Sequence, residues 1–179
     1  LMLQKLYALV TGQCSQDNPD SLMHHEVLLP GILLQMFMRE QLSEALIKVK
    51  DTILREFEGQ PQTMDLNDRE RILSLVVGSI GRIDLGRMAE YFLATGNLVS
   101  KTGLGLSQTS GFTIVADKLN YVRYLSHFRS IHRGAYYAEL RTTTVRKLLP
   151  DSWGFLCPVH TPDGSPCGLL NHLTASCFV

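Results

Sequence analysis

The sequence predicts an α+β fold whose first half is helical. In that half, apolar residues recur at steps of three and four, the spacing that lines one face of a helix. From Asn97 onward the composition shifts to Gly, Ser and Thr, and the later β-branched run from Thr142 to Val145 favours extended backbone. We find neither an internal repeat nor a low-complexity tract, so we expect helices followed by a mixture of loop, helix and strand.

The first two predicted helices are separated by a polar loop. Residues 1–11 have helical apolar spacing that Gly12 closes, and the loop extends from Gln13 to His25. Pro30 suits the first turn of the second helix, in which apolar residues between Ile32 and Phe57 line one face and charged residues take another. This mixed charge favours packing in a core over binding to a membrane or a partner helix.

Glycines and capping residues set the next helix ends. Gly59, Gln60 and Pro61 are predicted to break the long helix. Asn67 is expected to cap a short helix that ends at residues 78–81, where two glycines lie.

A further helix, a long loop and another helix follow. Asp84 is predicted to cap the first of these helices, and Gly96 to end it in the left-handed conformation that glycine favours. Residues 97–111, with Lys101 among them, form a long exposed loop, and loops of that length usually serve a function. Residues 119–128 then show a helical apolar stripe.

Strands are predicted after Gly134. The run from Thr142 to Val145 is expected to be extended, with basic neighbours pointing to both faces. Residues 175–179 resemble an unfinished apolar strand, so we expect the chain to be part of a longer polypeptide.

The composition excludes several classes of protein. An apolar fraction of 45% with 19% charged residues is typical of a globular protein and unlike a disordered tail. No apolar run is long enough to span a bilayer and no signal-peptide pattern is present, so an intracellular setting is expected. The four cysteines do not have the arrangement of a secreted disulfide framework, and we expect free thiols.

The net charge is zero, but the charges are unevenly distributed. Residues 87–147 hold nine Lys and Arg against three Asp and Glu, whereas residues 1–86 hold eight against twelve. A local positive field of this kind suits a surface that binds a polyanion. A solvated charged face is the simpler alternative.

The most specific pattern lies near the carboxyl end. Residues 153–164 read WGFLCPVHTPDG, and the two prolines and two glycines in this stretch define a rigid, sharply turned path. With Gly168 and Leu169, it resembles the W-G-x-x-C-P-x-x-T-P-[DE]-G-x-x-x-G-L segment of the second-largest subunits of multi-subunit RNA polymerases. Four shorter stretches resemble the polymerase I branch of that family: residues 94–97, 101–105, 125–129 and 141–146.

The resemblance implies a division of the chain into three regions. Residues 1–96 correspond to a protrusion-like helical region, and residues 97–147 to a fork-like region with two loops. Residues 148–179 correspond to the start of the following external domain. In this family the fork lies beside the RNA–DNA hybrid and the downstream DNA, and here it coincides with the basic segment.

The resemblance also implies a function and a set of binding residues. The region would position the DNA template and the RNA–DNA hybrid beside the active centre during ribosomal RNA synthesis, in the nucleus and nucleolus. Its partners would be that template and hybrid, the largest subunit and the other polymerase subunits. Six cations are expected to contact phosphates, which hold a nucleic acid without reading its sequence: Lys101, Arg129, Arg133, Arg141, Arg146 and Lys147.

The resemblance assigns no catalytic or metal-binding residue to this chain. In this family the magnesium-binding Asp cluster belongs to the largest subunit, so magnesium is expected in the complete enzyme and the chain alone is expected to be inactive. The sequence departs from relatives at His160, where they usually carry a Glu, and at Asp163, where they also carry a Glu. Any role of the first acidic residue therefore does not transfer to this chain.

Residues in and near the motif also suggest two other kinds of site. Cys157 and His160 could begin a zinc site, but Cys167 and Cys177 are too far apart to form the second knuckle. Cys157 and His160 could also serve as the thiol and imidazole of a hydrolase, but no third orienting group is evident. Buried free cysteines are the simpler interpretation.

Two further alternatives concern nucleic acid and partners. Gly103 and Gly105 lie in a glycine-rich loop whose backbone amides could meet a phosphate, although neither a dinucleotide fingerprint nor a P-loop surrounds them. The alternative function for the whole chain is a freestanding nucleic-acid-binding or protein-interaction module.

Overall fold

The computed structural model describes residues 1–59 and 67–179, which fall into two units. Residues 28–116 make up the helical unit, and residues 1–27 together with 117–179 make up the loop-rich unit. Helices dominate the secondary structure, and a two-stranded antiparallel sheet accompanies them, so the predicted α+β class is confirmed. None of the described helices combines the length and the apolar character needed to cross a membrane.

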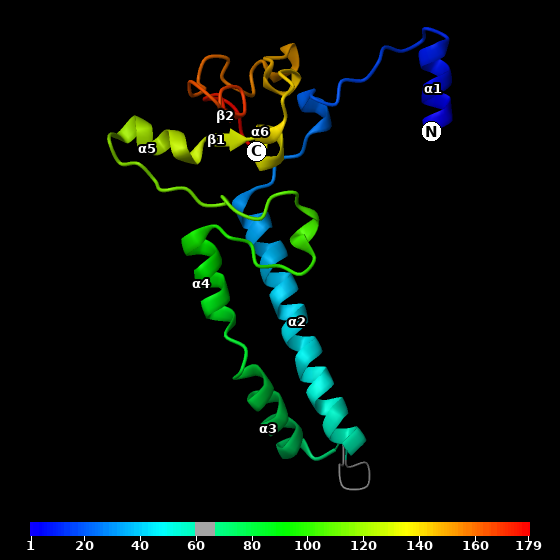
Figure 1. The fold of residues 1–179 in the computed structure, drawn as a ribbon, viewed down its shortest axis with the longest axis vertical. Helices are drawn as coiled ribbons and strands as arrows, with labels where there is room; N and C mark the ends of the chain where they lie inside the picture. The colour runs from blue at the N-terminus through cyan, green and yellow to red at the C-terminus, as the bar shows by residue number, and fades with distance from the viewer. Residues whose placement is uncertain (60–66) are drawn as a thin grey trace. The chain divides into compact units, whose positions relative to one another are not determined.

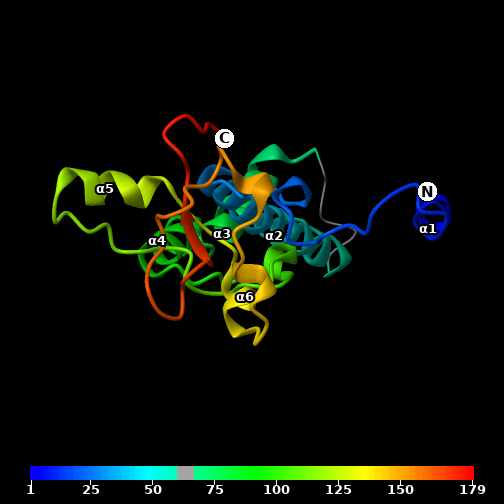
Figure 2. The ribbon, with the colours of Figure 1, turned by 90° about the horizontal axis from the view of Figure 1, so that it is seen from above.

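Three α-helices form the described part of the helical unit. The chain runs along α2 (Pro30–Gly59) and returns beside it through α3 (Arg69–Ile80) and α4 (Leu85–Thr95), as the side view and the view from above both show (Figures 1 and 2). The long predicted helix is confirmed, and Pro30 is its first residue, where the missing amide hydrogen leaves no intrahelical bond unmade.

The core of the helical unit is aromatic. The rings of Phe37 on α2 and Phe92 on α4 stack with their centroids 4.7 Å apart, and Leu98 completes the buried cluster. Phe37 is only 2% exposed. The apolar stripe of α2 thus packs against α4, and its mixed-charge outer face led us to expect packing of this kind.

The predicted helix ends are confirmed at one helix and corrected at another. Asp84 caps α4 by accepting a hydrogen bond from the Arg87 amide at 2.8 Å, and Gly96 ends it with φ +67°, both as predicted. The cap of α3 was wrongly assigned to Asn67, because the Asp68 carboxylate accepts the hydrogen bond from the first turn.

The predicted end of α3 and the predicted irregular segments before and after the α3–α4 pair can also be compared with the structure. The helix does not stop at its first glycine, Gly78, since a single glycine weakens a helix without ending it. The predicted break at Gln60 and Pro61 lies outside the described residues. After α4, residues 97–111 are irregular as predicted, apart from the short 3-10 turn η2 (Gly103–Gly105).

The loop-rich unit contains short elements. They are α1 (Met2–Val10), η1 (Leu22–His24), α5 (Tyr121–Phe128), β1 (Ser130–His132), α6 (Ala135–Glu139), η3 (Thr144–Arg146), η4 (Pro150–Ser152) and β2 (Leu170–His172). The predicted helices at residues 1–11 and 119–128 are confirmed as α1 and α5. β1 and β2 pair in antiparallel register, with Ile131 opposite Asn171.

A strand does occur after Gly134, as β2, but the extended conformation predicted for the run from Thr142 to Val145 was wrong. Residues 135–139 form α6, and the run from Thr142 to Val145 enters the 3-10 turn η3. The Thr142 hydroxyl accepts a hydrogen bond from the Thr144 amide and bonds the Thr144 hydroxyl. Such local bonds compete with a strand ladder. Residues 175–179 are likewise not a strand, and the second strand of the sheet lies earlier, as β2.

Candidate nucleic-acid interface

The six cations predicted to bind phosphates differ in exposure. Lys101, Arg141 and Lys147 are exposed, whereas Arg129, Arg133 and Arg146 are half-buried. Lys101 belongs to the helical unit and the other five to the loop-rich unit. Exposure matters because a phosphate contact requires a cation that is free to leave its intramolecular partners.

Lys101 lies on the irregular segment that follows α4. Its side chain is 74% exposed, and its ammonium nitrogen lies 3.1 Å from an oxygen of the Glu44 carboxylate on α2. Figure 1 shows this segment crossing the amino-terminal half of α2. The side chain thus projects from a loop whose backbone is held against a helix.

Arg141 and Lys147 flank the turn η3. Val145, within that turn, is only 6% exposed and fixes the segment to the loop-rich unit. No ion pair of Arg141 or Lys147 occurs within the described residues. An anchored turn therefore presents two exposed cations.

The half-buried Arg129 binds backbone carbonyls. It is the C-cap residue of α5, and its guanidinium group donates hydrogen bonds to the carbonyl oxygens of Thr174 and, at 3.4 Å, Cys177. A guanidinium group has five donors in a fixed fork, which suits two carbonyls at once. Arg129 consequently ties the end of α5 to the segment after β2.

Arg133 has the most intramolecular contacts of the six. Its guanidinium group pairs with the Asp20 carboxylate at 3.3 Å, donates to the Val145 carbonyl oxygen at 3.2 Å and lies 4.6 Å from the centroid of the Tyr137 ring. Both charged side chains are less than one fifth exposed. Arg133 thus joins three chain segments in the interior of the loop-rich unit.

Arg146 holds the proline- and glycine-rich motif. Its guanidinium group donates to the carbonyl oxygens of Ser165 and, at 2.9 Å, Cys167. Arg133, Arg146 and Lys147 together line a small pocket of about 150 Å³. The structure therefore brings three of the predicted residues to one place, although two of them are engaged within the unit.

The motif is also tied together by its own side chains. The Thr161 hydroxyl donates to the Leu170 carbonyl oxygen at 2.9 Å and accepts from the Gly168 amide at 3.0 Å. The rings of His160 and His172 stack 3.5 Å apart, and His172 is 6% exposed. His160, the departure from the family pattern, thus contacts another histidine.

The thiols near the motif belong to no metal-binding cluster among the described residues. Cys157, Cys167 and Cys177 are free, and the residues that the structure describes contain no group of three metal-binding side chains. No hydrogen bond joins Cys157 to His160 within the described chain. The His160 ring instead stacks on the ring of His172.

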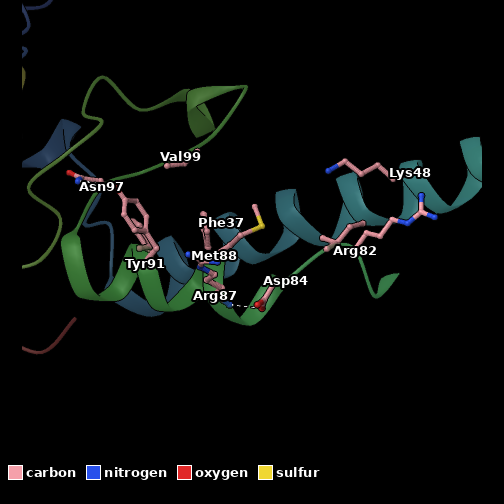
Figure 3. Close-up of a pocket in the computed structure, with 11 residues that line it drawn as sticks. Phe37, Lys48, Arg82, Asp84, Arg87, Met88, Tyr91, Asn97 and Val99 are labelled. Atoms are coloured by element: carbon pink, nitrogen blue, oxygen red, sulfur yellow. Dashed lines mark hydrogen bonds between the residues drawn. The ribbon is translucent and has the colours of Figure 1, made fainter. Parts of the chain in front are cut away.

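A separate pocket of about 380 Å³ lies in the helical unit (Figure 3). Its floor is apolar and includes Phe37 and Met88, while Lys48, Arg82 and Arg87 contribute cations. None of the six predicted residues lines it. An apolar floor suits side-chain packing more than a row of phosphates.

Sequence reasoning missed the acidic residues that contact the predicted cations. Asp20 pairs with Arg133, while Glu40 and Glu44 on α2 contact the Lys101 loop. Glu40 and Glu44 are spaced four residues apart and so share a helix face. That spacing was visible in the sequence, but their partners, about 60 residues away, were not.

Comparisons with known proteins identify the family. A family model described as RNA polymerase Rpb2, domain 3, matches residues 114–179. Over 179 residues the chain is 56% identical to DNA-directed RNA polymerase I subunit RPA2 of Homo sapiens. The chain belongs to the family of RNA polymerase I second-largest subunits.

Other relatives agree with this membership. Identity is 54% over 178 residues to the probable RNA polymerase I subunit RPA2 of Schizosaccharomyces pombe, and 51% over 178 residues to subunit RPA135 of Saccharomyces cerevisiae. Each match covers at least 99% of this chain but only 14–15% of the relative. The family predicted from the motif is confirmed, and the chain spans about 15% of the length of its RPA2 relatives.

Proposed function

We propose that this region helps to hold the DNA template and the RNA–DNA hybrid beside the active centre of DNA-directed RNA polymerase I during ribosomal RNA synthesis. The main support for this proposal is a set of exposed cations that project from anchored irregular segments within the basic stretch 87–147: Lys101, Arg141 and Lys147. A nucleic acid that moves through the enzyme needs contacts that do not depend on its sequence, and cation–phosphate contacts meet this requirement.

The proposed contribution is positional. Lys101, Arg141 and Lys147 would each neutralise a phosphate. Arg133 and Arg146 attach the turn η3, which Arg141 and Lys147 flank, and Arg129 attaches the end of α5. Magnesium in the largest subunit would supply the nucleotidyl-transfer chemistry. We expect the chain alone to lack polymerase activity.

The proposal also covers the setting of the whole protein. We infer assembly with the largest subunit and the other polymerase subunits, and a location in the nucleus and its nucleolus, where ribosomal RNA is made. Support comes from the names of the relatives, which are subunits of DNA-directed RNA polymerase I.

The test measures the stability of elongation complexes of assembled RNA polymerase I against salt concentration. Lys101→Ala, Arg141→Ala and Lys147→Ala are each expected to lower the salt slope of binding by about one. Without the cation, one phosphate is no longer neutralised, so fewer counterions are released from the nucleic acid on binding. Lys50→Ala removes an exposed cation of α2 outside the basic stretch and serves as the matched control. Normal assembly of all three variants with wild-type stability at every salt concentration would overturn the proposal.

A further inference from the structure

We propose that Glu40 and Glu44, one turn apart on α2, act on Lys101 in opposite ways. Glu40 is a positioning residue that holds the backbone of the Lys101 loop, whereas Glu44 competes with a nucleic-acid phosphate for the Lys101 ammonium group. This inference rests on the phosphate contact proposed above for Lys101 and adds how that contact is set up and restrained.

Glu40 binds the loop directly beside Lys101. One oxygen of its carboxylate, Oε1, accepts hydrogen bonds from the Thr102 amide at 3.2 Å and from the Thr102 hydroxyl at 2.8 Å. The Thr102 hydroxyl in turn accepts from the Leu104 amide at 3.2 Å and caps the turn η2. A single carboxylate oxygen thus fixes both the loop backbone and the turn that follows.

The environment of Glu40 keeps it in the acceptor form. Burial raises the pKa of its carboxyl group, but the nearby Ser100 hydroxyl, the hydrogen bonds from Thr102 and the charge of Lys101 act against burial, and the pKa is lowered overall. Its other oxygen, Oε2, is buried without a hydrogen-bond partner in the described part of the chain. A buried unpaired oxygen is unfavourable, so Glu40 contributes through the loop contacts of Oε1.

Gln41 attaches the loop on the other side of Lys101. Its side chain is 4% exposed, and its amide nitrogen donates to the Val99 carbonyl oxygen at 3.4 Å. Neighbouring residues of α2 therefore hold the loop at positions 99 and 102. These hydrogen bonds hold the backbone on both sides of Lys101, while its long side chain is exposed.

Glu44 meets that side chain. The Lys101 ammonium nitrogen lies 3.1 Å from Oε2 of Glu44, and the lysine is 74% exposed while the glutamate is 22% exposed. An ion pair with one exposed partner is weak, so a phosphate can displace it. Glu44 thus keeps Lys101 oriented without nucleic acid and lowers its affinity for phosphate.

The simplest rival explanation is general repulsion between α2 carboxylates and nucleic acid. It predicts that removing any carboxylate strengthens binding. The opposite roles predict different signs for Glu40→Ala and Glu44→Ala, although both remove one negative charge from one helix face. Asp51→Ala removes the same charge from α2 two turns beyond Glu44 and serves as the control.

The experiment uses assembled RNA polymerase I and measures dissociation of its elongation complexes across a salt series. Glu44→Ala is expected to slow dissociation at low salt by roughly two- to fivefold, the range of a surface ion pair. Glu40→Ala is expected to accelerate it, and Glu40→Gln, which keeps the acceptor oxygen, to restore most of the loss. Asp51→Ala should change little, and Lys101→Ala should abolish the gain from Glu44→Ala.

Hydrogen exchange of residues 99–106 in the same complexes separates the two proposals. Faster exchange in Glu40→Ala with unchanged dissociation would support the anchor while contradicting the phosphate contact of Lys101. Wild-type exchange in Glu40→Ala would overturn the positioning role. Slower dissociation in both Glu40→Ala and Glu44→Ala would favour general repulsion and overturn the inference.

Discussion

The two units hold their irregular segments by different means. In the helical unit, one long helix supplies the attachment points, since Glu40 and Gln41 bind the backbone of the loop and an aromatic core supports it. The loop-rich unit has no long helix among its described residues, and half-buried arginines such as Arg129 and Arg146 bind backbone carbonyls instead. Side chains provide the attachment in both units, through a carboxylate and an amide in the helical unit and through guanidinium groups in the loop-rich unit.

This difference shows that a basic stretch is not one surface. Arg133 and Arg141 lie eight residues apart, yet Arg133 is engaged with a carboxylate, a carbonyl and a ring, while Arg141 is exposed. Guanidinium groups satisfy several acceptors at once, so they are suited to replace missing backbone hydrogen bonds. Charge counting cannot separate these uses, whereas substitution can.

The largest effect is expected in the core of the helical unit. Phe37→Ala removes a buried ring that stacks on Phe92, and it should lower the free energy of unfolding of this unit by about 3–5 kcal/mol. Phe57→Ala, at an exposed position of the same helix, is the control. Hydrogen exchange of α2 and α4 in the assembled subunit measures both, and equal effects would show that the Phe37 cluster is not what holds the unit.

The next effect is expected at the central arginine of the loop-rich unit. Arg133→Ala leaves the Asp20 carboxylate without its partner, and breaking a largely buried pair costs about 3 kcal/mol. Arg141→Ala, the exposed neighbour, should leave unit stability unchanged. Hydrogen exchange at residues 20–25 and 143–147 tests this, and an unaltered Arg133→Ala protein would mean that the pair is dispensable.

The sequence predicted the fold well where the signals are local and poorly where the structure depends on distant partners. Long apolar periodicity and single-residue signals such as Asp84 and Gly96 located the helices α2 and α4 correctly, because those signals act within one or two turns. The Thr142 to Val145 run was wrongly predicted as a strand, because β propensity depends on a partner strand and local hydroxyl bonds formed instead.

The sequence predicted which cations belong to the candidate site, but not which residues they contact within the protein. The motif located the family, and the charge count located the basic stretch, so all six cations were named. Their partners, such as Asp20 for Arg133 and Glu44 for Lys101, lie far away in the sequence. Pairing over that distance depends on the tertiary fold, which no local pattern contains. The phosphate contacts themselves stay predictions.

A smaller effect is expected at two glycines, one in each unit. A Cβ atom on Gly96 would lie 2.6 Å from the Thr113 amide nitrogen, and one on Gly168 would lie 2.5 Å from the Arg146 carbonyl oxygen. Both residues have positive φ, so alanine adds backbone strain to a clash with backbone atoms, together about 2 kcal/mol.

Gly12 is the matched control for both glycines. It also has positive φ, but no atom lies within 4 Å of its Cβ position, so alanine there should cost only about 1 kcal/mol. Thermal unfolding of the three variants in the assembled subunit compares them. A Gly168→Ala effect no larger than that of Gly12→Ala would show that the motif can move away from Arg146, and that this arginine holds the loop-rich unit less firmly than its contacts indicate.

The smallest effect is expected from a change between pH 7.5 and pH 5.5, a range in which the buried His172 of the loop-rich unit titrates in the unfolded chain. Burial lowers the pKa of His172 below its ordinary value of 6.5, and charge on His160, Arg123 and His127 lowers it further, while the hydrogen bond to the His160 carbonyl oxygen acts in the opposite sense. As the pH falls, His172 therefore takes up a proton at a higher pH in the unfolded chain than in the folded one. Stability from neutral His172 is complete above pH 6.5 and decreases as the pH falls below that value.

Hydrogen exchange at two pH values tests this, after correction for intrinsic exchange rates. The Cys157 amide, which donates to the His172 carbonyl oxygen at 2.8 Å, should lose protection between pH 7.5 and pH 5.5, whereas amides of α2 should not. His172→Asn removes the titrating ring and should flatten this dependence, while His24→Asn, at an exposed site, should preserve it. An equal loss of protection in both units would assign the pH response to the whole assembly rather than to the buried imidazole.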